Sequence, residues 1–413
     1  MAADGRVEVD CFDEDEWYIQ GPSKLMINSK LPDVGVTIFT VMSRLATETR
    51  AINLGQGFPD FDPDAGLLAQ VDAAMAAGHN QYAPMPGIPA LRAAIAAKTR
   101  ALYGAAYDPE TEITVTSGAT QALMTAILAV AGAGDEVIVL EPNYDSYVPA
   151  IRLAGAVPVA VQLLAPTPEV PGYRPDWDAV RRAITPRTRA LVINFPHNPT
   201  GAVLDESDLD ELERILADTG VVLISDEVYE HIVFDGRRHA SIARRPALAA
   251  RSFLVSSFGK TFHTTGWKIG YCCAPAALSA EFRKIHQFMV FAVSTPMQYA
   301  LSTFLEDPRH YLELPAFYQA KRDRLEAGLK QTRFRTLPCP GTYFLLADYS
   351  AISDAPESEF ARWLTTEHGV AVIPIAAFHA DPDAPASNRQ LVRFCFAKKD
   401  STLDAALERL KRV

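Results

Sequence analysis

The sequence predicts an α/β protein with two parts: a large domain, whose mostly parallel sheet is covered by helices on both faces, and a smaller α+β domain. The chain has 413 residues, which is more than one core of ordinary size accommodates. From about residue 87 to 275, short apolar runs alternate with segments of helical period, and after about residue 305 the alternation ends. This change of pattern favours two domains of different architecture.

The strands of the large domain are predicted from unbroken apolar runs rich in β-branched residues. They lie at residues 137–140, 190–194, 221–225, 253–256 and 269–273. The apolar spacing predicts helices at residues 89–103, 118–131 and 205–218. Strands that read as continuous apolar runs are typical of a parallel sheet that is buried on both faces.

The small domain is predicted from the elements that follow the change of pattern. A long helix is expected at 311–331, with strands at 343–347, 370–373 and 391–396, and the segment 36–51 is expected to pack with them. The predicted organisation is an N-terminal extension and arm at 1–50, a large domain at 51–305 and a small C-terminal domain at 306–413. Residues 1 to about 25 are expected to form a poorly ordered extension.

Composition and charge argue against several classes of function. A formal charge of −11 makes nucleic acid and anionic membrane surfaces poor partners. No segment is long and apolar enough to span a bilayer, and the acidic N-terminus lacks the apolar core of a signal peptide. The five cysteines fit neither a disulfide framework nor a zinc site. We therefore expect a cytoplasmic protein without a metal site.

The most informative segment is SSFGKTFHTTGWKIG, residues 256–270, which lies between two predicted buried strands. A lysine taken alone is usually a solvated surface residue. Lys260, however, is surrounded by small and hydroxyl-bearing residues, a second cation follows at Lys268, and glycines permit close approach of the backbone. The surroundings thus favour a catalytic role for Lys260.

This segment resembles the cofactor-lysine motif of the class I and II (fold-type I) aminotransferases, which use pyridoxal phosphate. The resemblance runs from about residue 32 to the end of the chain. The segments NLGQGFPDF at 53–61 and FTVMSRL at 39–45 are most similar to the branch that contains kynurenine/glutamine and methionine aminotransferases. Several separate motifs agree in order, so the similarity to the family is specific.

The resemblance implies roles for the residues of the reacting centre. Lys260 would hold pyridoxal phosphate as a Schiff base and then act as general base and acid on the substrate. Asp226 would pair with the pyridine nitrogen, while Tyr229 and Asn198 would share the ring oxygen. Taken alone, Asp226 after a strand also fits a helix N-cap, and residues 197–201 also fit a plain turn.

The resemblance also implies a phosphate site and a partner subunit. The phosphate would bind at the start of the helix that begins at 118 and next to two side chains near Lys260. Tyr144 would stack on the cofactor ring. Tyr82 would reach the phosphate of a neighbouring subunit, which implies a homodimer. The phosphate contacts would be Gly118, Ala119, Thr120, Ser257 and Lys268.

The substrate is expected to bind through its α-carboxylate. Arg393 lies inside an apolar strand pattern, where a charge must be paired, and its planar guanidinium fits a carboxylate. A structural ion pair is the alternative for Arg393. By resemblance, Gly57 and Asn198 would contact the same carboxylate. The side-chain pocket would be apolar, with no clear second arginine for a distal carboxylate, and would be lined by Ile38, Phe39, Phe288, Tyr343 and Phe378.

The predicted function is ping-pong transamination from an L-amino acid, such as methionine, an aromatic amino acid or kynurenine, to a 2-oxo acid. One alternative is β-elimination from cysteine conjugates at the same site. A second is a non-catalytic regulator that binds the cofactor, although only about 30 residues precede the resemblance, too few for a DNA-binding domain. A nicotinamide dehydrogenase is disfavoured because no glycine-rich dinucleotide motif joins a strand to a helix.

Overall fold

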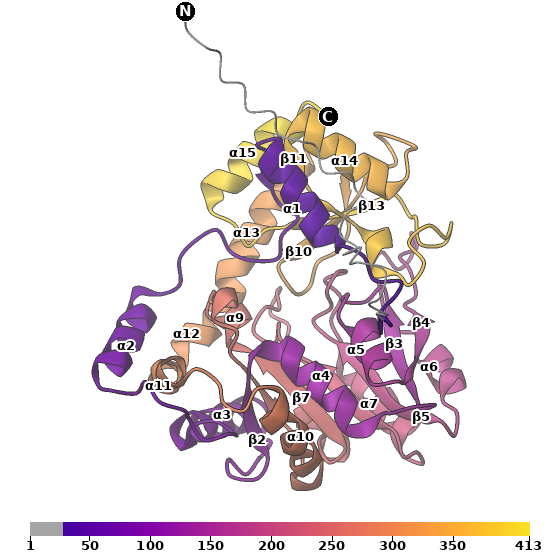
Figure 1. Ribbon diagram of the computed structural model, residues 1–413. Coiled ribbons are helices and arrows are strands. Elements are labelled where there is room, and N and C mark those ends of the chain that lie inside the picture. The colour runs from indigo at the N-terminus through magenta and orange to yellow at the C-terminus, as the bar shows by residue number, and fades with distance from the viewer. Residues whose placement is uncertain (1–27) are drawn as a thin grey trace, which may run out of the picture.

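The architecture is that of a computed structural model, which describes residues 28–413 (Figure 1). The predicted N-terminal extension and Cys11 lie outside the described residues. Two main sheets carry the fold, one of seven strands and one of four, and helices pack around them. The predicted fold class is therefore confirmed.

The seven-stranded sheet has the order β2-β8-β7-β6-β5-β3-β4. All of its strands run parallel except β8, which is antiparallel to both β2 and β7. The strands are β2 (Ile113–Thr116), β3 (Glu136–Glu141), β4 (Val157–Gln162), β5 (Thr188–Asn194), β6 (Val222–Asp226), β7 (Ser252–Ser257) and β8 (Gly270–Cys273). The carboxyl ends of β3, β5, β6 and β7 thus meet at one edge, where ligands bind in such sheets.

Helices cover both faces of this sheet because its strands point apolar side chains to both sides. One face packs on α4 (Gly118–Val130), α5 (Tyr147–Leu153) and α10 (Ala276–Met289). The other face packs on α3 (Pro89–Tyr103), α6 (Trp177–Ala183) and α7 (Glu206–Leu216). Asp205 caps α7 and forms a reciprocal pair with Asp208. The remaining helices near this sheet are α2 (Ala65–Ala76), α8 (Pro246–Ala249), α9 (Phe258–Thr261) and α11 (Thr295–Phe304).

The second sheet has the order β12-β13-β10-β9 and is antiparallel. Its strands are β9 (Arg335–Thr336), β10 (Phe344–Asp348), β12 (Ile373–Pro374) and β13 (Leu391–Cys395). The N-terminal arm joins this part of the molecule, since α1 (Ile38–Glu48) packs near α14 (Glu357–His368) and β1 (Ile52–Asn53) pairs with β11 (Val370–Ala371). The helix α15 (Asp400–Leu410) closes the chain. The domain boundaries at residues 50 and 305 stay a prediction.

Two predicted elements are each divided in the structure. The helix expected at 311–331 consists of α12 (Arg309–Leu312) and α13 (Leu314–Leu329). Pro315 has no N–H to continue the hydrogen bonds of α12 and its ring would clash with the preceding turn, so a second helix begins there. The strand expected at 370–373 consists of β11 and β12, which pair with different partners. The unbroken apolar run at 370–373 gives no sign of that break in the sequence.

A buried ion pair ties α3 to the segment after β6. The amine of Lys98 donates to Glu230 Oε1 at 2.7 Å and to the hydroxyl of Tyr271 at 2.8 Å. The Glu230 carboxylate also accepts from Tyr103 at 2.5 Å and from Ser256 at 2.6 Å. Burial opposes ionisation, but the charge of Lys98 holds the pKa of Glu230 below its usual value. This network fixes the backbone next to two predicted site residues, since Glu230 follows Tyr229 and Ser256 precedes Ser257.

Removing one partner of this pair should destabilise the fold strongly. Lys98→Met leaves the Glu230 carboxylate buried without its cation, which typically costs about 3–5 kcal/mol. The midpoint of thermal unfolding should therefore fall by at least about 5 °C. Arg100→Met, at an exposed position on the same helix, is the matched control and should leave the midpoint unchanged. Equal midpoints for the two variants would show that the pair contributes nothing to stability.

Candidate active site

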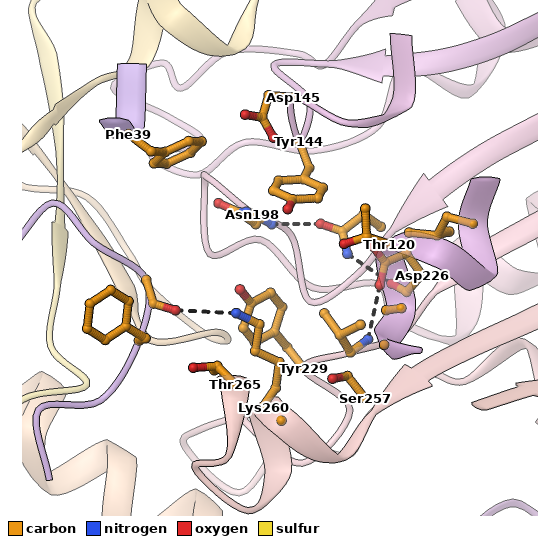
Figure 2. A pocket seen from close by; sticks show the side chains of 18 of the residues that line it. Phe39, Thr120, Tyr144, Asp145, Asn198, Asp226, Tyr229, Ser257, Lys260 and Thr265 are labelled. Carbon is orange, nitrogen blue, oxygen red and sulfur yellow. Dashed lines mark hydrogen bonds between the residues drawn. The ribbon is translucent and has the colours of Figure 1, made fainter. Parts of the chain in front are cut away.

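A cavity of about 420 Å³ opens at the strand ends of the large sheet and reaches the second sheet (Figure 2). Residues from both sheets line it, together with the segment that follows β1. Thirteen of the predicted site residues are among its lining: Phe39, Gly57, Gly118, Ala119, Thr120, Tyr144, Asn198, Asp226, Tyr229, Ser257, Lys260, Lys268 and Arg393. Predicted residues as far apart in the sequence as Phe39 and Arg393 thus line one cavity.

Three predicted site residues do not line this cavity. Tyr343 is buried behind it, and its hydroxyl donates to the carbonyl oxygen of Gly57 at 2.6 Å. Ile38 lies on α1 beside Phe39, which does line the cavity. Tyr82 is 82% exposed, and its ring meets that of Phe291 edge-on, with 5.2 Å between the two ring centroids. The roles expected of these residues stay predictions.

Two further residues expected in the substrate pocket also lie outside the lining. Phe288 is 88% exposed, at the end of α10. Phe378 is buried, and its ring centroid lies 4.9 Å from the guanidinium carbon of Arg393, so it supports that side chain from behind the cavity wall.

Lys260 stands on the short helix α9, directly after β7. Its amine donates to the carbonyl oxygen of Gly57 at 3.3 Å and lies 5.8 Å from the ring centroid of Tyr229 (Figure 2). Burial, helped by the charges of Lys268 and Arg393, lowers the pKa of this amine to about 8, against the charge of Asp226. A large share of Lys260 is therefore neutral and nucleophilic slightly above neutral pH.

Asp226 is the last residue of β6 and is buried. Its Oδ2 accepts a hydrogen bond from the hydroxyl of Tyr147 at 2.7 Å, and its Oδ1 accepts from the backbone N–H of Val228 at 3.2 Å. Burial raises its pKa to about 6, against these two hydrogen bonds. Turns rather than a helix follow Asp226, so the alternative of a helix N-cap is excluded.

The helix α4 begins at the cavity wall and offers an anion site. Its N-cap, Ser117, makes no side-chain capping hydrogen bond, and Gly118 has a positive φ of 74° that favours glycine. A Cβ placed on Gly118 would lie 3.2 Å from the amine of Lys268, so a cation adjoins the first turn of the helix. A helix N-terminus, this cation and the nearby Ser257 form a site of the kind that holds phosphate.

Arg393 enters the cavity from β13 and is 1% exposed. Its Nη1 donates to Asn198 Oδ1 at 2.6 Å and its Nη2 to the carbonyl oxygen of Gly55 at 3.0 Å, while its Nε has no partner among residues 28–413. The ring centroid of Phe344 lies 3.8 Å from its guanidinium carbon. Burial lowers its pKa to about 10. No acidic side chain of the described chain lies within 4.0 Å of it, so the alternative of a structural ion pair is not supported.

Asn198 and Asp226 are linked through a residue that the sequence analysis did not single out. The side chain of Asn194, at the end of β5, accepts from the backbone N–H of Asn198 at 2.9 Å and donates to the carbonyl oxygen of Asp226 at 2.9 Å. Asn194 also lines the cavity. Its place at a strand end was the signal that could have identified it.

The sequence analysis also missed other residues in and around the cavity. Tyr147 holds the Asp226 carboxylate without lining the cavity itself. Asp145 lies beside Tyr144, and nothing in the sequence distinguishes it from an ordinary loop aspartate. The remaining lining residues are Thr37, Gln56, Phe58, Leu123, Val228, Gly259, Thr265 and Phe344.

Comparison with known proteins agrees with this geometry. The family described as "Aminotransferase class I and II" matches residues 49–410. A methionine aminotransferase of Escherichia coli (strain K12) is 52% identical over 390 residues, which cover 94% of this chain and 99% of that protein. A kynurenine–oxoglutarate transaminase 3 of Mus musculus is 36% identical over 394 residues, 90% of this chain and 86% of that protein.

A solved structure gives the same result. One crystal structure is of an Escherichia coli protein for which a methionine aminotransferase function was identified. It matches this chain with a TM-score of 0.90 and 51% sequence identity, and the match covers 94% of this chain and 100% of that one. In the described part of this chain, no helix has the length and apolar character required to cross a membrane, and no group of three or more His, Cys, Asp or Glu side chains could hold a metal ion.

The lowered pKa of Lys260 gives a direct prediction. In the cofactor-free protein, this amine should lose its proton with a midpoint near pH 8, because burial and neighbouring cations disfavour the ammonium form. Lysine amines labelled with ¹³C-methyl groups report their titration by NMR. One resonance, missing in Lys260→Ala, should titrate near pH 8. A Lys260 midpoint above about 10 would contradict the buried environment.

Proposed function

The chain belongs to the class I and II aminotransferases, which depend on pyridoxal phosphate, and from this premise we propose which residues hold the cofactor and which substrates the enzyme takes. The proposed reaction is ping-pong transfer of the amino group of an L-amino acid with a large apolar or aromatic side chain to a 2-oxo acid. The observation that carries the proposal is the pairing, in one cavity, of a buried amine of lowered pKa with a buried guanidinium that lacks a carboxylate partner.

The cavity offers a complementary group for each part of the cofactor. When bound, pyridoxal phosphate supplies an aldehyde that joins to amines and a ring that withdraws electrons from the substrate's Cα. Lys260 would hold the aldehyde end through its Nζ, and the same Nζ would take the proton from the Cα of the substrate. The lowered pKa of Lys260 suits both tasks, since a nucleophile and a base must be neutral.

Asp226 holds the ring nitrogen in this proposal. The raised pKa of about 6 reflects burial, which outweighs the charge of Lys260, and a protonated ring nitrogen would add a second cation. Tyr147 fixes the orientation of the carboxylate through its hydrogen bond. Tyr229 and Asn198 hold the ring oxygen, and Tyr144 stacks on the ring. Tyr229 suits a donor role, because burial raises the pKa of its phenol and keeps the proton on the oxygen.

The phosphate site and the α-carboxylate site use different residues of the cavity lining. Gly118, Ala119 and Thr120 offer the amides of the first turn of α4, and Ser257 and Lys268 add a hydroxyl and a positive charge. Arg393 receives the α-carboxylate, and its unpartnered Nε is the observation that supports this assignment. Gly57 and Asn198 line the same region.

The side-chain preference follows from aromatic residues in the lining. Phe39, Phe58, Tyr144 and Phe344 line the cavity, and Ile38 and Tyr343 support it. Such surfaces favour a thioether or an aromatic ring over a charged group. The printed names of the relatives, methionine aminotransferase and kynurenine–oxoglutarate transaminase, fit this preference.

We also propose a cytoplasmic homodimer that shares residues between its sites. Large apolar side chains are exposed around Tyr82, namely Phe288, Met289 and Phe291, and such a patch is typical of a surface that another chain covers. Tyr82 would then reach the phosphate in the partner's cavity. The four described cysteines are free thiols, as expected in a reducing compartment.

The assignment of Lys260 is tested by substitution. Lys260→Ala should abolish the visible absorbance of the covalently held cofactor and lower the turnover of methionine with a 2-oxo acid by at least about a thousandfold, because one group provides both nucleophile and base. Lys284→Ala, at an exposed lysine, is the matched control and should retain full activity. Retained turnover in Lys260→Ala would refute the assignment.

The shared dimer site is tested by mixing two impaired variants. Tyr82→Ala and Lys260→Ala should each have low activity, but each mixed dimer would contain one intact site if Tyr82 acts across the interface. Statistical mixing makes half of the dimers mixed, so the mixture should recover roughly a quarter of the wild-type activity. If the mixture shows only the sum of the two separate activities, Tyr82 does not act in the partner's site.

A further inference from the structure

We propose that His286 is a positioning residue that connects the phosphate site of its own subunit to the loop that carries Tyr82 toward the site of the partner subunit. This inference rests on the proposed function, because the phosphate site and the role of Tyr82 are both proposed there. His286 does not line the cavity, so it acts through its two hydrogen-bond partners, Gln121 and Met85.

The imidazole of His286 bridges a helix and a loop. It stands on α10, is fully buried, and faces α4, against which α10 packs (Figure 1). Its Nδ1 lies 3.1 Å from Nε2 of Gln121, in the second turn of α4. Its Nε2 lies 3.2 Å from the carbonyl oxygen of Met85, in the loop before α3. One ring thus contacts both segments that the proposed function assigns to phosphate.

The partners of the ring determine which nitrogen carries the proton. A carbonyl oxygen can only accept, so the Nε2–H of His286 donates to Met85. Its Nδ1 is then the acceptor, and Nε2 of Gln121 donates to it. Burial lowers the pKa of His286, helped by the charge of Arg283 and against the hydrogen bond to Met85. The ring is therefore neutral, with both nitrogens used.

The side chain of Gln121 extends this chain of hydrogen bonds to the start of α4. Its Nε2 also donates to the hydroxyl of Thr125 at 2.6 Å, which leaves Oε1 as the acceptor. Oε1 accepts from the backbone N–H of Ser117, the N-cap of α4, at 3.0 Å. The amides of residues 118–120, which follow directly, form the proposed phosphate site. His286 thus fixes the amide that orients the first turn.

The other side of His286 fixes the loop of Tyr82. Met85 follows Tyr82 in this loop, and its carbonyl oxygen receives the Nε2–H. The backbone carbonyl of His286 accepts from the N–H of Phe291 at 3.2 Å, and the ring of Phe291 meets that of Tyr82 edge-on. The exposed phenol of Tyr82 is therefore supported from two sides by one residue.

Removing the imidazole leaves a buried donor at Gln121 and a buried acceptor at Met85 without their partners. Both groups must then shift toward other partners, because an unpaired buried polar group is costly. The shift displaces the first turn of α4 and the Tyr82 loop, which both serve the phosphate. The aldehyde end of the cofactor, at Lys260, is not held by either segment.

A purely structural role of His286 predicts a different result. If the residue only stabilised the packing of α10 on α4, its removal would weaken every ligand of the cavity alike. If it positions the phosphate site, the loss should depend on the phosphate group. Pyridoxal has the ring and aldehyde of the cofactor without the phosphate, so a comparison of the two compounds separates the roles.

The experiment titrates cofactor-free protein with each compound and follows the visible absorbance of the covalently held ligand. His286→Leu should weaken pyridoxal phosphate on the order of tenfold and pyridoxal by less than about threefold. Gln121→Leu removes only the connection to α4 and should weaken pyridoxal phosphate by about threefold. Lys284→Ala, at an exposed position on the same helix, is the control and should change neither dissociation constant.

The connection to Tyr82 is tested in the Tyr82→Ala background. There the loop carries no phenol, so adding His286→Leu should cost only about threefold more, the same as Gln121→Leu. A further tenfold loss in that background, an equal loss for pyridoxal, or a wild-type dissociation constant for pyridoxal phosphate in His286→Leu would overturn the proposal. If His286→Leu does not fold, Gln121→Leu supports the same comparison, and a wild-type affinity in that variant would overturn the connection to α4.

Inorganic phosphate keeps this test separate from the proposed function. If neither compound forms a visible species with the wild type, the assignment of Lys260 fails. Titration of the cofactor-free protein with phosphate, followed by ³¹P NMR, still reports the anion site. His286→Leu should weaken phosphate on the order of tenfold and Lys284→Ala should not. Equal phosphate affinities in the two variants would overturn the role of His286.

Discussion

The cost of burying the Lys260 ammonium is the constraint on which the rest of the site depends. An amine in contact with bulk water would be almost fully protonated at neutral pH and would not react with an aldehyde. Enclosure between the strand ends and the Gly57 segment lowers its pKa, and the charges of Lys268 and Arg393 add to this effect. The negative charge of Asp226 opposes the shift and so limits how far the pKa of Lys260 falls. The residues that shield the Lys260 amine from water therefore also set its reactivity.

The enclosure needs both sheets. Arg393 comes from β13 in the second sheet and holds Asn198, which follows β5 in the first. The segment at Gly55 and Gly57 lies between them and accepts hydrogen bonds from Arg393, Lys260 and Tyr343. A Cβ on Gly57 would lie 2.8 Å from the ring of Phe344, so only glycine fits there without displacing the cavity wall. The carboxylate site and the reacting amine are therefore connected through one short stretch of backbone.

The sequence predicted much of this arrangement because its signals are local. Apolar runs placed the strands, and the rule that ligands bind beyond strand ends placed Asp226 and Asn198 together. The family resemblance, which the comparisons confirm, added Lys260 and Arg393. The residues that escaped prediction act through contacts that local patterns do not encode. Tyr147 reaches Asp226 from a helix 79 positions earlier, and Asp145 lines the cavity although no pattern in its local sequence marks it as a site residue. Tyr82 is exposed on the single chain, and its expected role depends on a second chain.

The most direct test of the central claim is to find where the cofactor is attached. Borohydride reduction of the holoenzyme fixes the cofactor to its amine, and peptide mass spectrometry then locates it. A single modified peptide that contains Lys260, with the added mass of the reduced cofactor on its side chain, is the predicted result. Attachment at Lys268 or at any other lysine, or no covalent attachment in an active enzyme, would contradict the account.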